Sequence, residues 1–490
     1  MSKLWQSGAL LALALLGGCT VGPKYQRPAA VPAPPTWKTT APWSQATPQD
    51  SIPKGSWWSI FKDAELDSYE QQLLKSNQSL SAAQSRLSQA RAVARVSTAG
   101  LFPQLNLDLS AERQRISGNR PLVGSTAALS PVTQNTFTVP FSVSYEADLF
   151  GRVRRGVEAS NASLQGTAAD LGNTQLVLTA ELAADYFTLR ELDAELDVLN
   201  ESVSIEERGL HLVKNREQGG IASGLEVAQQ ATLLDSTRTQ VYLAQQQRNQ
   251  YEHAIAVLVG QSASSFSVPV RALKATPPPV PLGLPSDILE RRPDIAAAER
   301  TMAFENAEVG IAKAAFYPRI TLSAGGGYQS RDIASLINAP SAIWAIGSDL
   351  FQPILNGGRN RANLAAQQSA YDQSVANYRQ SVLQAFQQVE DALSGLNTLS
   401  SAVQTQQAAV ADAQRSLTIA NNRYVGGITT YLDVITAQAN LLADQRLATQ
   451  LLGQQMVTSV YLVKALGGGW DATDIQNERV RPNLRQIVQQ

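Results

Sequence analysis

The sequence predicts a mainly α-helical fold made of long antiparallel coiled coils, with an internal duplication and a smaller β part. Proline, the strongest helix breaker, is absent from residues 141–268 and 354–481, although the chain contains 23 prolines. Each long helical run in these stretches is interrupted once by a Gly-Gly break, and Ile221 and Ile428 in the two breaks lie 207 positions apart (428 − 221). A repeat of this length indicates that nearly half of the chain is duplicated.

Leucine and valine recur every seventh residue along both helical runs. They are Leu182, Leu189, Leu196, Val203 and Leu210 in the first run, and Val382, Val389, Leu396, Val403, Val410 and Leu417 in the second. A sustained seven-residue repeat imposes a left-handed supercoil. A helix from Gly151 to about Glu217 would be roughly 100 Å long at 1.5 Å per residue. Periodicity alone therefore favours an antiparallel coiled-coil rod.

The chain begins with a targeting segment at residues 1–18. Lys3 supplies a positive charge, and the apolar run from Ala9 to Leu16 is too short to cross a bilayer. The following Leu16-Gly17-Gly18-Cys19 resembles the lipobox of bacterial lipoproteins, in which the cysteine is acylated after cleavage. Cys19 is the only cysteine, so we expect a covalent lipid there and no other cofactor. The alternative is an ordinary signal peptide followed by an incidental cysteine.

Residues 19–55 are rich in proline and predict an extended, poorly packed tether leading away from the lipid. A helical stretch from about Trp57 to Ala99 follows, and its counterpart runs from about Asp294 to Ala315. The duplication divides the folded part into a first repeat at 56–268, with a hairpin at 103–150 and a helix pair at 151–268, a linker at 269–285, a second repeat at 286–469, with a hairpin at 318–353 and a helix pair at 357–467, and a tail at 470–490.

Four strands are predicted, two in each hairpin, because apolar and polar residues alternate there. Leu105, Leu107 and Leu109 alternate with polar neighbours, and the run from Phe137 to Tyr145 does the same. Such strands fit a transmembrane barrel or a half-buried soluble sheet equally well. Four strands cannot close in lipid, where unpaired backbone groups are costly. If these strands lie in a membrane, several subunits must share one barrel.

Composition and motifs exclude several classes of function. The net charge is −1 and no stretch is basic, which argues against a nucleic-acid partner. His211 and His253 have no ligand-spaced neighbours, so we do not expect a metal site. We find no nucleophile–base constellation and no phosphate-binding loop, and Gly325-Gly326-Gly327 indicates only a bend in a strand. The sequence therefore does not predict an enzyme.

These features resemble the outer-membrane factor family of tripartite efflux pumps, the TolC-like channels, and in particular its lipidated OprM-like branch. The motifs that carry the likeness are Cys19-Thr20-Val21-Gly22-Pro23-Lys24-Tyr25-Gln26-Arg27-Pro28, Leu289-Glu290-Arg291-Arg292-Pro293-Asp294-Ile295, Gly357-Gly358-Arg359 after Phe351, and Arg423-Tyr424 with Gly426-Gly427. The resemblance covers nearly the whole chain.

The resemblance implies a homotrimer in which four strands per subunit form a twelve-stranded β-barrel in the bacterial outer membrane. Long helices would form an α-barrel across the periplasm, with an equatorial belt from residues near Trp57–Tyr69, from Pro269–Pro285 and from the tail after Gly469. A periplasmic membrane-fusion adaptor and an inner-membrane transporter of the resistance-nodulation-division (RND) type would be its partners. The chain would conduct drugs or other small compounds passively, gated at the helix tips.

The resemblance also implies where the gate lies. Leu432 matches a hydrophobic pore position and Asp433 an acid that many members use, whereas Thr436 replaces the second family acid. Arg423 and Tyr424 match residues that latch the closed state. The adaptor-contacting tips would be Gly219, Gly220, Ser223, Gly426, Gly427 and Thr430. A second interpretation of Asp433 is that it only favours the start of a helix, where the dipole stabilises an acid.

Three other functions are considered. A type I protein-secretion channel would share the fold and the trimer but use other partners. A lipid-anchored periplasmic coiled-coil scaffold would have no pore and would show no conductance. A hydrolase is least favoured, since the sequence contains no recognisable site.

Overall fold

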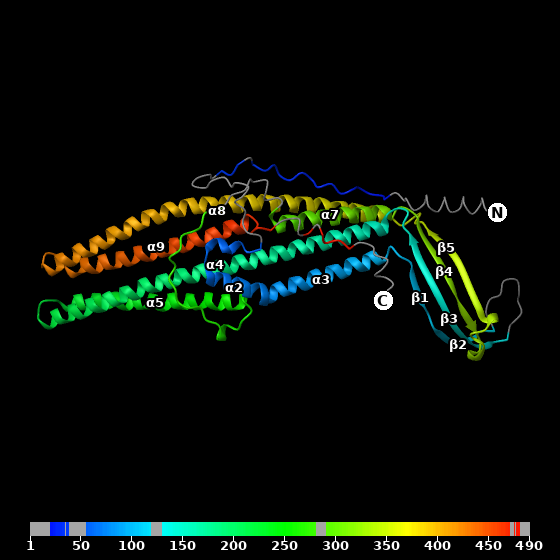
Figure 1. Cartoon of the computed structure of the whole chain (residues 1–490), viewed down its shortest axis with the longest axis horizontal. Coiled ribbons are helices and arrows are strands. Elements are labelled where there is room, and N and C mark those ends of the chain that lie inside the picture. Colours follow the sequence, from blue (N-terminus) through cyan, green and yellow to red (C-terminus); the bar gives the residue numbers. More distant parts are fainter. Residues whose placement is uncertain are drawn as a thin grey trace.

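The computed structural model describes residues 20–34, 36–38, 55–118, 130–280, 291–470, 475 and 477–480. The signal peptide at 1–18, Cys19 and parts of the predicted tether, first hairpin, linker and tail lie outside the described residues. Figure 1 shows the long helices running side by side along one axis, with the strands at one end and two helix turns at the other.

Both repeats consist of a shorter helix, a hairpin and a long helix pair. The first contains α2 (Ala64–Ser76), α3 (Gln78–Ala99), β1 (Gln104–Leu107), β2 (Ser110–Ile116), β3 (Val132–Ala147), α4 (Arg152–Gln218) and α5 (Gly224–Leu258), and the second contains α7 (Pro293–Ala314), β4 (Arg319–Ser330), β5 (Ala342–Phe351), α8 (Arg359–Val425) and α9 (Tyr431–Ala465). Short 3-10 turns lie at Trp57–Phe61, Ala263–Ser265, Ile333–Ser335 and Ala339–Ser341. The limits of α8 and α9 are those of α4 and α5 moved by 207 positions, so the predicted duplication is confirmed.

The long helices α4 and α8 have 67 residues each, which confirms the predicted length. The predicted seam is buried at Leu182, Leu189 and Leu196 in α4 and at the second-repeat seam positions from Val382 to Leu396. Toward the tips Val203 is only half-buried. Because α4 packs against α3, α5, α7 and α9, its apolar face is covered along most of its length.

The first helical stretch is broken, which corrects the expectation of one helix from about Trp57 to Ala99. Asn77 has an extended backbone and separates α2 from α3. Its side-chain oxygen accepts a hydrogen bond from the Leu80 amide at 2.9 Å, and its amide nitrogen donates to the Leu258 carbonyl at 2.8 Å. The break is therefore stabilised by an N-cap and by a contact with a distant helix, which local sequence patterns do not reveal.

The described strands occupy four positions in one antiparallel sheet, as predicted. β1 and β2 both pair with β3 in the same register, so they are one strand interrupted at residues 108 and 109. Pro140 lies opposite Asp108 and accepts its amide at 3.1 Å, but it has no N–H to donate in return. Pro140 also faces Gly327 of β4, where a Cβ atom would lie 2.1 Å from the Val139 carbonyl oxygen. Glycine is therefore required there by the close approach of the backbones.

The two faces of the sheet differ in polarity. Leu105, Val143, Ala324 and Ile346 form one row of directly paired residues across the sheet, and the adjacent row, on the opposite face, contains Asn106, Ser142, Gly325 and Ala345. The apolar side chains are largely exposed in the single chain, with Ile346 79% exposed. One apolar face and two unpaired edges, on β1/β2 and on β5, are typical of a sheet that is completed and covered in a larger assembly.

The described part of the tether packs closely on the helices, contrary to the expectation of poorly packed chain. The Val21 amide donates to the Phe150 carbonyl at 3.1 Å, the Tyr25 hydroxyl donates to the Glu299 carboxylate, and Arg27 donates to the Tyr378 hydroxyl at 3.2 Å. Residues 20–34 contain no helix or strand, and the aromatic and charged side chains between the prolines attach the segment to α7 and α8.

The described parts of the three predicted belt segments meet along one part of α4. Trp57 donates to the Thr179 hydroxyl at 3.1 Å, the Leu273 amide donates to the Arg190 carbonyl at 3.0 Å, and Trp470 packs directly on Gly172. Among the described helices, none is both long enough and apolar enough to cross a membrane.

Candidate functional site: the glycine turns at the helix tips

The two turns at the helix tips have the same backbone structure. In the first, the Ile221 amide donates to the Arg216 carbonyl at 2.8 Å and the Gly220 amide donates to the Glu217 carbonyl at 2.8 Å. These two hydrogen bonds form a Schellman C-cap, which needs one residue in the left-handed backbone conformation. Gly220 supplies it with φ +73°, and its counterpart Gly427 has the same φ. Open space surrounds both glycines, so the backbone conformation rather than crowding requires them.

The residues after the glycines differ between the two turns. Ser223 caps α5 by accepting a hydrogen bond from the Glu226 amide at 3.4 Å, whereas Thr430 makes no side-chain cap at the start of α9. In the second turn the Thr429 hydroxyl instead donates to the carboxylate of Asp433. Ile221 and Ile428 project into solvent at the two tips, 71% and 70% exposed. The tips therefore present matching apolar side chains on rigid turns.

A buried cluster joins the second helix pair to the first just above the turns. Tyr424 of α8 and Tyr431 of α9 are 6% and 2% exposed, and their ring centroids lie 4.9 Å apart. Val213 of α4 and Val434 of α9 belong to the same cluster. Separation of the two helix pairs at this end would expose these side chains to water. The free-energy cost of this exposure favours the state in which the pairs are in contact.

Tyr424 also makes polar contacts with the first repeat. Its hydroxyl donates to the Glu226 carboxylate at 3.2 Å, and the Arg216 guanidinium lies over its ring at 4.7 Å from the centroid. Burial, followed by the negative charge of Glu226, raises the pKa of Tyr424, so the hydroxyl keeps its proton and remains a donor. Tyr424 thus connects the end of α8 to the start of α5 and the end of α4.

A second polar chain lies one helix turn deeper. The Tyr431 hydroxyl donates to the Gln230 side-chain oxygen at 2.9 Å, and the Gln230 amide donates to the Glu206 carbonyl at 3.0 Å. Gly209 admits this arrangement, because a Cβ atom there would lie 3.0 Å from the Tyr431 hydroxyl. Thr237 donates to one oxygen of the Glu206 carboxylate at 3.1 Å, and burial raises the pKa of Glu206.

The structure places the predicted gate residues in two groups. Leu432, Asp433 and Thr436 lie on exposed positions in the first turns of α9, where the Thr436 hydroxyl donates to the Leu432 carbonyl at 2.8 Å. Tyr424 is buried in the contact between the helix pairs. Arg423 is exposed, and we find no ion pair for it within the described chain. Its position in the contact is taken by Arg216, its first-repeat counterpart.

Sequence reasoning missed the partners of Tyr424. Arg216 and Glu226 precede Arg423 and Asp433 by 207 positions, so the duplication itself was the signal that could have found them. Tyr431 and Gln230 had no such signal, because their counterparts, Gly224 and Ala437, are not polar side chains.

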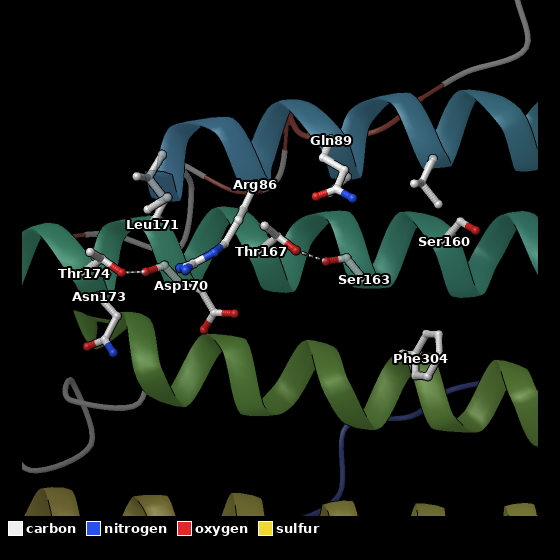
Figure 2. A pocket seen from close by; sticks show the side chains of 13 residues that line it. Arg86, Gln89, Ser160, Ser163, Thr167, Asp170, Leu171, Asn173, Thr174 and Phe304 are labelled. Atoms are coloured by element: carbon white, nitrogen blue, oxygen red, sulfur yellow. Dashed lines mark hydrogen bonds between the residues drawn. The ribbon is translucent and has the colours of Figure 1, made fainter. Parts of the chain in front are cut away.

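A groove of about 590 Å³, lined by both polar and apolar side chains, lies between α3, α4 and α7, far from the tips. In Figure 2 Arg86 reaches from α3 toward α4 beside Asp170, while Gln89, Thr167 and Asn173 line the same space. Another hollow of about 490 Å³ is lined by further residues of α3 and α4 and by Ser144 and Thr321 of the sheet. Within the described residues no cluster of His, Cys, Asp and Glu could hold a metal ion.

Comparison with known proteins shows the family of this chain. A family model described as outer membrane efflux protein matches residues 70–261 and 284–468. The chain belongs to the outer membrane efflux protein family. This efflux protein is 33% identical to the pyoverdine export outer membrane protein OpmQ of Pseudomonas aeruginosa over 462 residues, covering 94% of this chain and 96% of the relative. It is 32% identical to the toluene efflux pump outer membrane protein TtgF of Pseudomonas putida over 469 residues, 93% of this chain and 95% of the relative.

Solved structures agree with the family. The outer-membrane channel OprN matches this efflux protein with a TM-score of 0.85 and 28% identity, covering 92% of this chain and 100% of that one. The outer membrane protein VceC of Vibrio cholerae matches with a TM-score of 0.78 and 28% identity, covering 86% and 100%. The protein is therefore an outer-membrane efflux channel with a long periplasmic helical extension, and not an enzyme.

Proposed function

We propose that the protein is the homotrimeric outer-membrane channel of a tripartite efflux pump. It receives drugs or other small compounds from a periplasmic adaptor and an inner-membrane RND-type transporter and conducts them passively to the exterior. The observation that carries this proposal is the sheet: it has an apolar face, a polar face and two unpaired edges, at the end of helices roughly 100 Å long. Three copies would pair the edges into a barrel of twelve strands.

The polar side of the molecule supports a conducting lumen. Ser144 and Thr321, on the polar face of the sheet, line the hollow that also contacts α3 and α4. In α7, Phe304 lines the groove of Figure 2, whereas Glu299 and Asn306 hold the tether. At 100° per residue those two lie on the other side of the helix from Phe304. The tether then runs along the outside and the grooves face the interior.

The gate of this channel lies at the tips. Leu432 and Asp433 of three chains would face one axis, where three carboxylates favour cations. This chain has Thr436 at the position where the family has its second acid. The turns with Gly219, Gly220 and Ser223 and with Gly426, Gly427 and Thr430 would contact the adaptor, with Ile221 and Ile428 as apolar anchors. The tip apolar residues are exposed in the single chain, which suits an interface with another protein.

The first expected result is the oligomeric state. Detergent-solubilised protein should contain three subunits by native mass spectrometry, because a four-stranded sheet with open edges cannot exist alone in lipid. The same sample should form conducting pores in planar bilayers. A stable monomer or dimer would contradict the shared barrel, and a trimer without conductance would favour the periplasmic scaffold. A type I secretion channel would conduct too, and pull-down of its adaptor and transporter partners distinguishes it.

The second expected result concerns the lipid anchor. Cys19, which lies outside the described residues, immediately precedes Thr20, whose neighbour Val21 is fixed to Phe150 at the base of the sheet. Labelled palmitate should enter the wild-type protein and not Cys19→Ser. Equal labelling of the two proteins would rule out acylation of this residue. Recovery of equal amounts of the two proteins from the cell envelope would serve as the control that Cys19→Ser is made and exported.

A further inference from the structure

The second repeat contains six residues at the base of the sheet that the first repeat lacks. Phe150 is followed directly by Gly151, which precedes α4 with φ +83°. Phe351 is followed by residues 352–357 before Gly358, which precedes α8 with φ +84°. The two glycines are equivalent, so residues 352–357, here named the junction loop, are an addition at a fixed place in the fold.

The junction loop carries two protruding apolar side chains. Ile354 is 95% exposed and Leu355 is 93% exposed, more than any other large apolar side chain of the described residues. Burial of each side chain in an apolar environment is favourable, because it removes apolar surface from water. Gln352 fixes the start of the loop by donating to the Phe316 carbonyl at 3.2 Å. The exposed pair is therefore held on an anchored loop.

Contacts of the tether place Thr20 close to this loop. Thr20, which follows the predicted acylation site Cys19 in the sequence, packs directly on Gly151 at the start of α4. One small pocket at the base of the sheet is lined by Phe150 beside Gly151 and by Phe351, Pro353 and Arg359 around the loop. The junction loop and Thr20 therefore lie at the same end of the strands.

The charges beside the loop are also distinctive. Arg152 and Arg154, at the start of α4, form ion pairs with Glu146 at 2.6 Å and Asp148 at 3.2 Å. Arg359 and Arg361, at the start of α8, are exposed and have no ion pair within the described chain. An apolar pair next to unpaired arginines is typical of segments that lie at a membrane surface, where the cations meet phosphate groups.

We propose that the junction loop is a second membrane anchor, which inserts Ile354 and Leu355 into the acyl region of the leaflet that holds the lipid on Cys19. Arg359 and Arg361 bind the phospholipid phosphates of that leaflet. The inference rests on the proposed function, which places the sheet in the membrane. A lipid partner is favoured because the loop continues the apolar face of β5, with Trp344 and Ile346, toward the level of the acyl anchor.

A single-site fluorescence experiment tests this proposal. Acylation of Cys19 leaves no other cysteine, so Leu355→Cys gives the acylated full-length protein one free thiol for the environment-sensitive dye NBD. The labelled trimer is placed in phosphatidylethanolamine–phosphatidylglycerol liposomes with and without nitroxide-labelled lipid. Trp344→Cys, on the apolar face of the sheet, is the control within the membrane, and Ile428→Cys at the tip is the control in water.

We expect the dye at position 355 to emit at short wavelength and to lose most of its emission to the nitroxide lipid, as at position 344. Arg359→Gln with Arg361→Gln should weaken this quenching most in liposomes rich in phosphatidylglycerol. Emission at 355 that matches position 428, with quenching at 344, would overturn the proposal and leave the membrane-spanning sheet intact. Absence of quenching at 344 would overturn both.

The alternative partner of the junction loop is a neighbouring subunit, because β5 is an unpaired edge of the sheet. Phe102 lies just before β1, which is at the opposite edge of the sheet from β5. A disulfide between subunits in Leu355→Cys with Phe102→Cys, together with a dye at 355 that lipid does not quench, would show that the loop packs against a neighbouring subunit. That result would also overturn the proposal.

Discussion

Replacement of Tyr424 by Phe is expected to raise the open fraction of the channel about a hundredfold in planar bilayers. The change removes only the hydroxyl that donates to Glu226, and keeps the ring that contacts Arg216 and Tyr431. A hydrogen bond to a charged group contributes about 1.5–3 kcal/mol, and partial exposure of Glu226 lowers this to ~1 kcal/mol per chain. Three copies then contribute ~3 kcal/mol, which corresponds to about two orders of magnitude in the closed-to-open ratio.

Matched variants separate this contact from its neighbours. Glu226→Gln should act in the same direction as Tyr424→Phe, and the double variant should add little, since both remove one interaction. Arg423→Ser, which alters an exposed side chain outside the contact, should leave conductance unchanged. Asp433→Asn should also leave the pore shut but reduce its block by divalent cations. A wild-type open fraction in trimeric Tyr424→Phe, with opening in Arg423→Ser, would place the latch at Arg423.

The helices and strands could be predicted because their signals are local. A long run without proline, a seven-residue apolar repeat and a Gly-Gly break at each tip together determine α4, α8 and α9 within a few residues. The first helix pair was predicted to end at 268, whereas α5 ends at Leu258. The alternation of apolar and polar residues predicted all four strand positions. Even the gap between β1 and β2 has a cause that is visible in the sequence, since Pro140 removes one donor from β3, although its partner cannot be known before the register is known.

Contacts between distant segments could not be predicted in the same way. The break at Asn77 depends on the Leu258 carbonyl, and attachment of the tether depends on Glu299 and Tyr378. At the tips, the family resemblance implied Arg423 as the latch arginine, whereas in the structure Arg216 contacts Tyr424 and Arg423 is exposed. The two are equivalent under the duplication, and only the packing of one helix pair on the other decides which of them meets Tyr424.

A buried ion network in the belt had a weak sequence signal, a charged pair inside the leucine seam of α4. The Asp193 carboxylate is fully buried and accepts hydrogen bonds from Arg190 at 2.9 Å, from Arg248 of α5 at 2.7 Å and from the Arg271 amide at 2.9 Å. Arg190 and Arg248 also donate to the carbonyls of Pro269 and Val268. One carboxylate thus holds the segment after α5 against the middle of the α4–α5 pair.

Asp193→Ala is expected to destabilise this part of the belt by about 3 kcal/mol, because it removes the fully buried carboxylate that Arg190 and Arg248 share. The two guanidinium groups then keep only Glu65 and Glu252 as counter-ions. Hydrogen exchange measures the effect locally: protection of the Arg271 and Leu273 amides should fall by two to three orders of magnitude. Asp235→Ala, which breaks the exposed pair with Arg238, should change protection less than tenfold. If Asp193→Ala also lowered the hydrogen-exchange protection of these amides less than tenfold, the segment would be held by its apolar contacts at Val268 and Val280 rather than by the ion network.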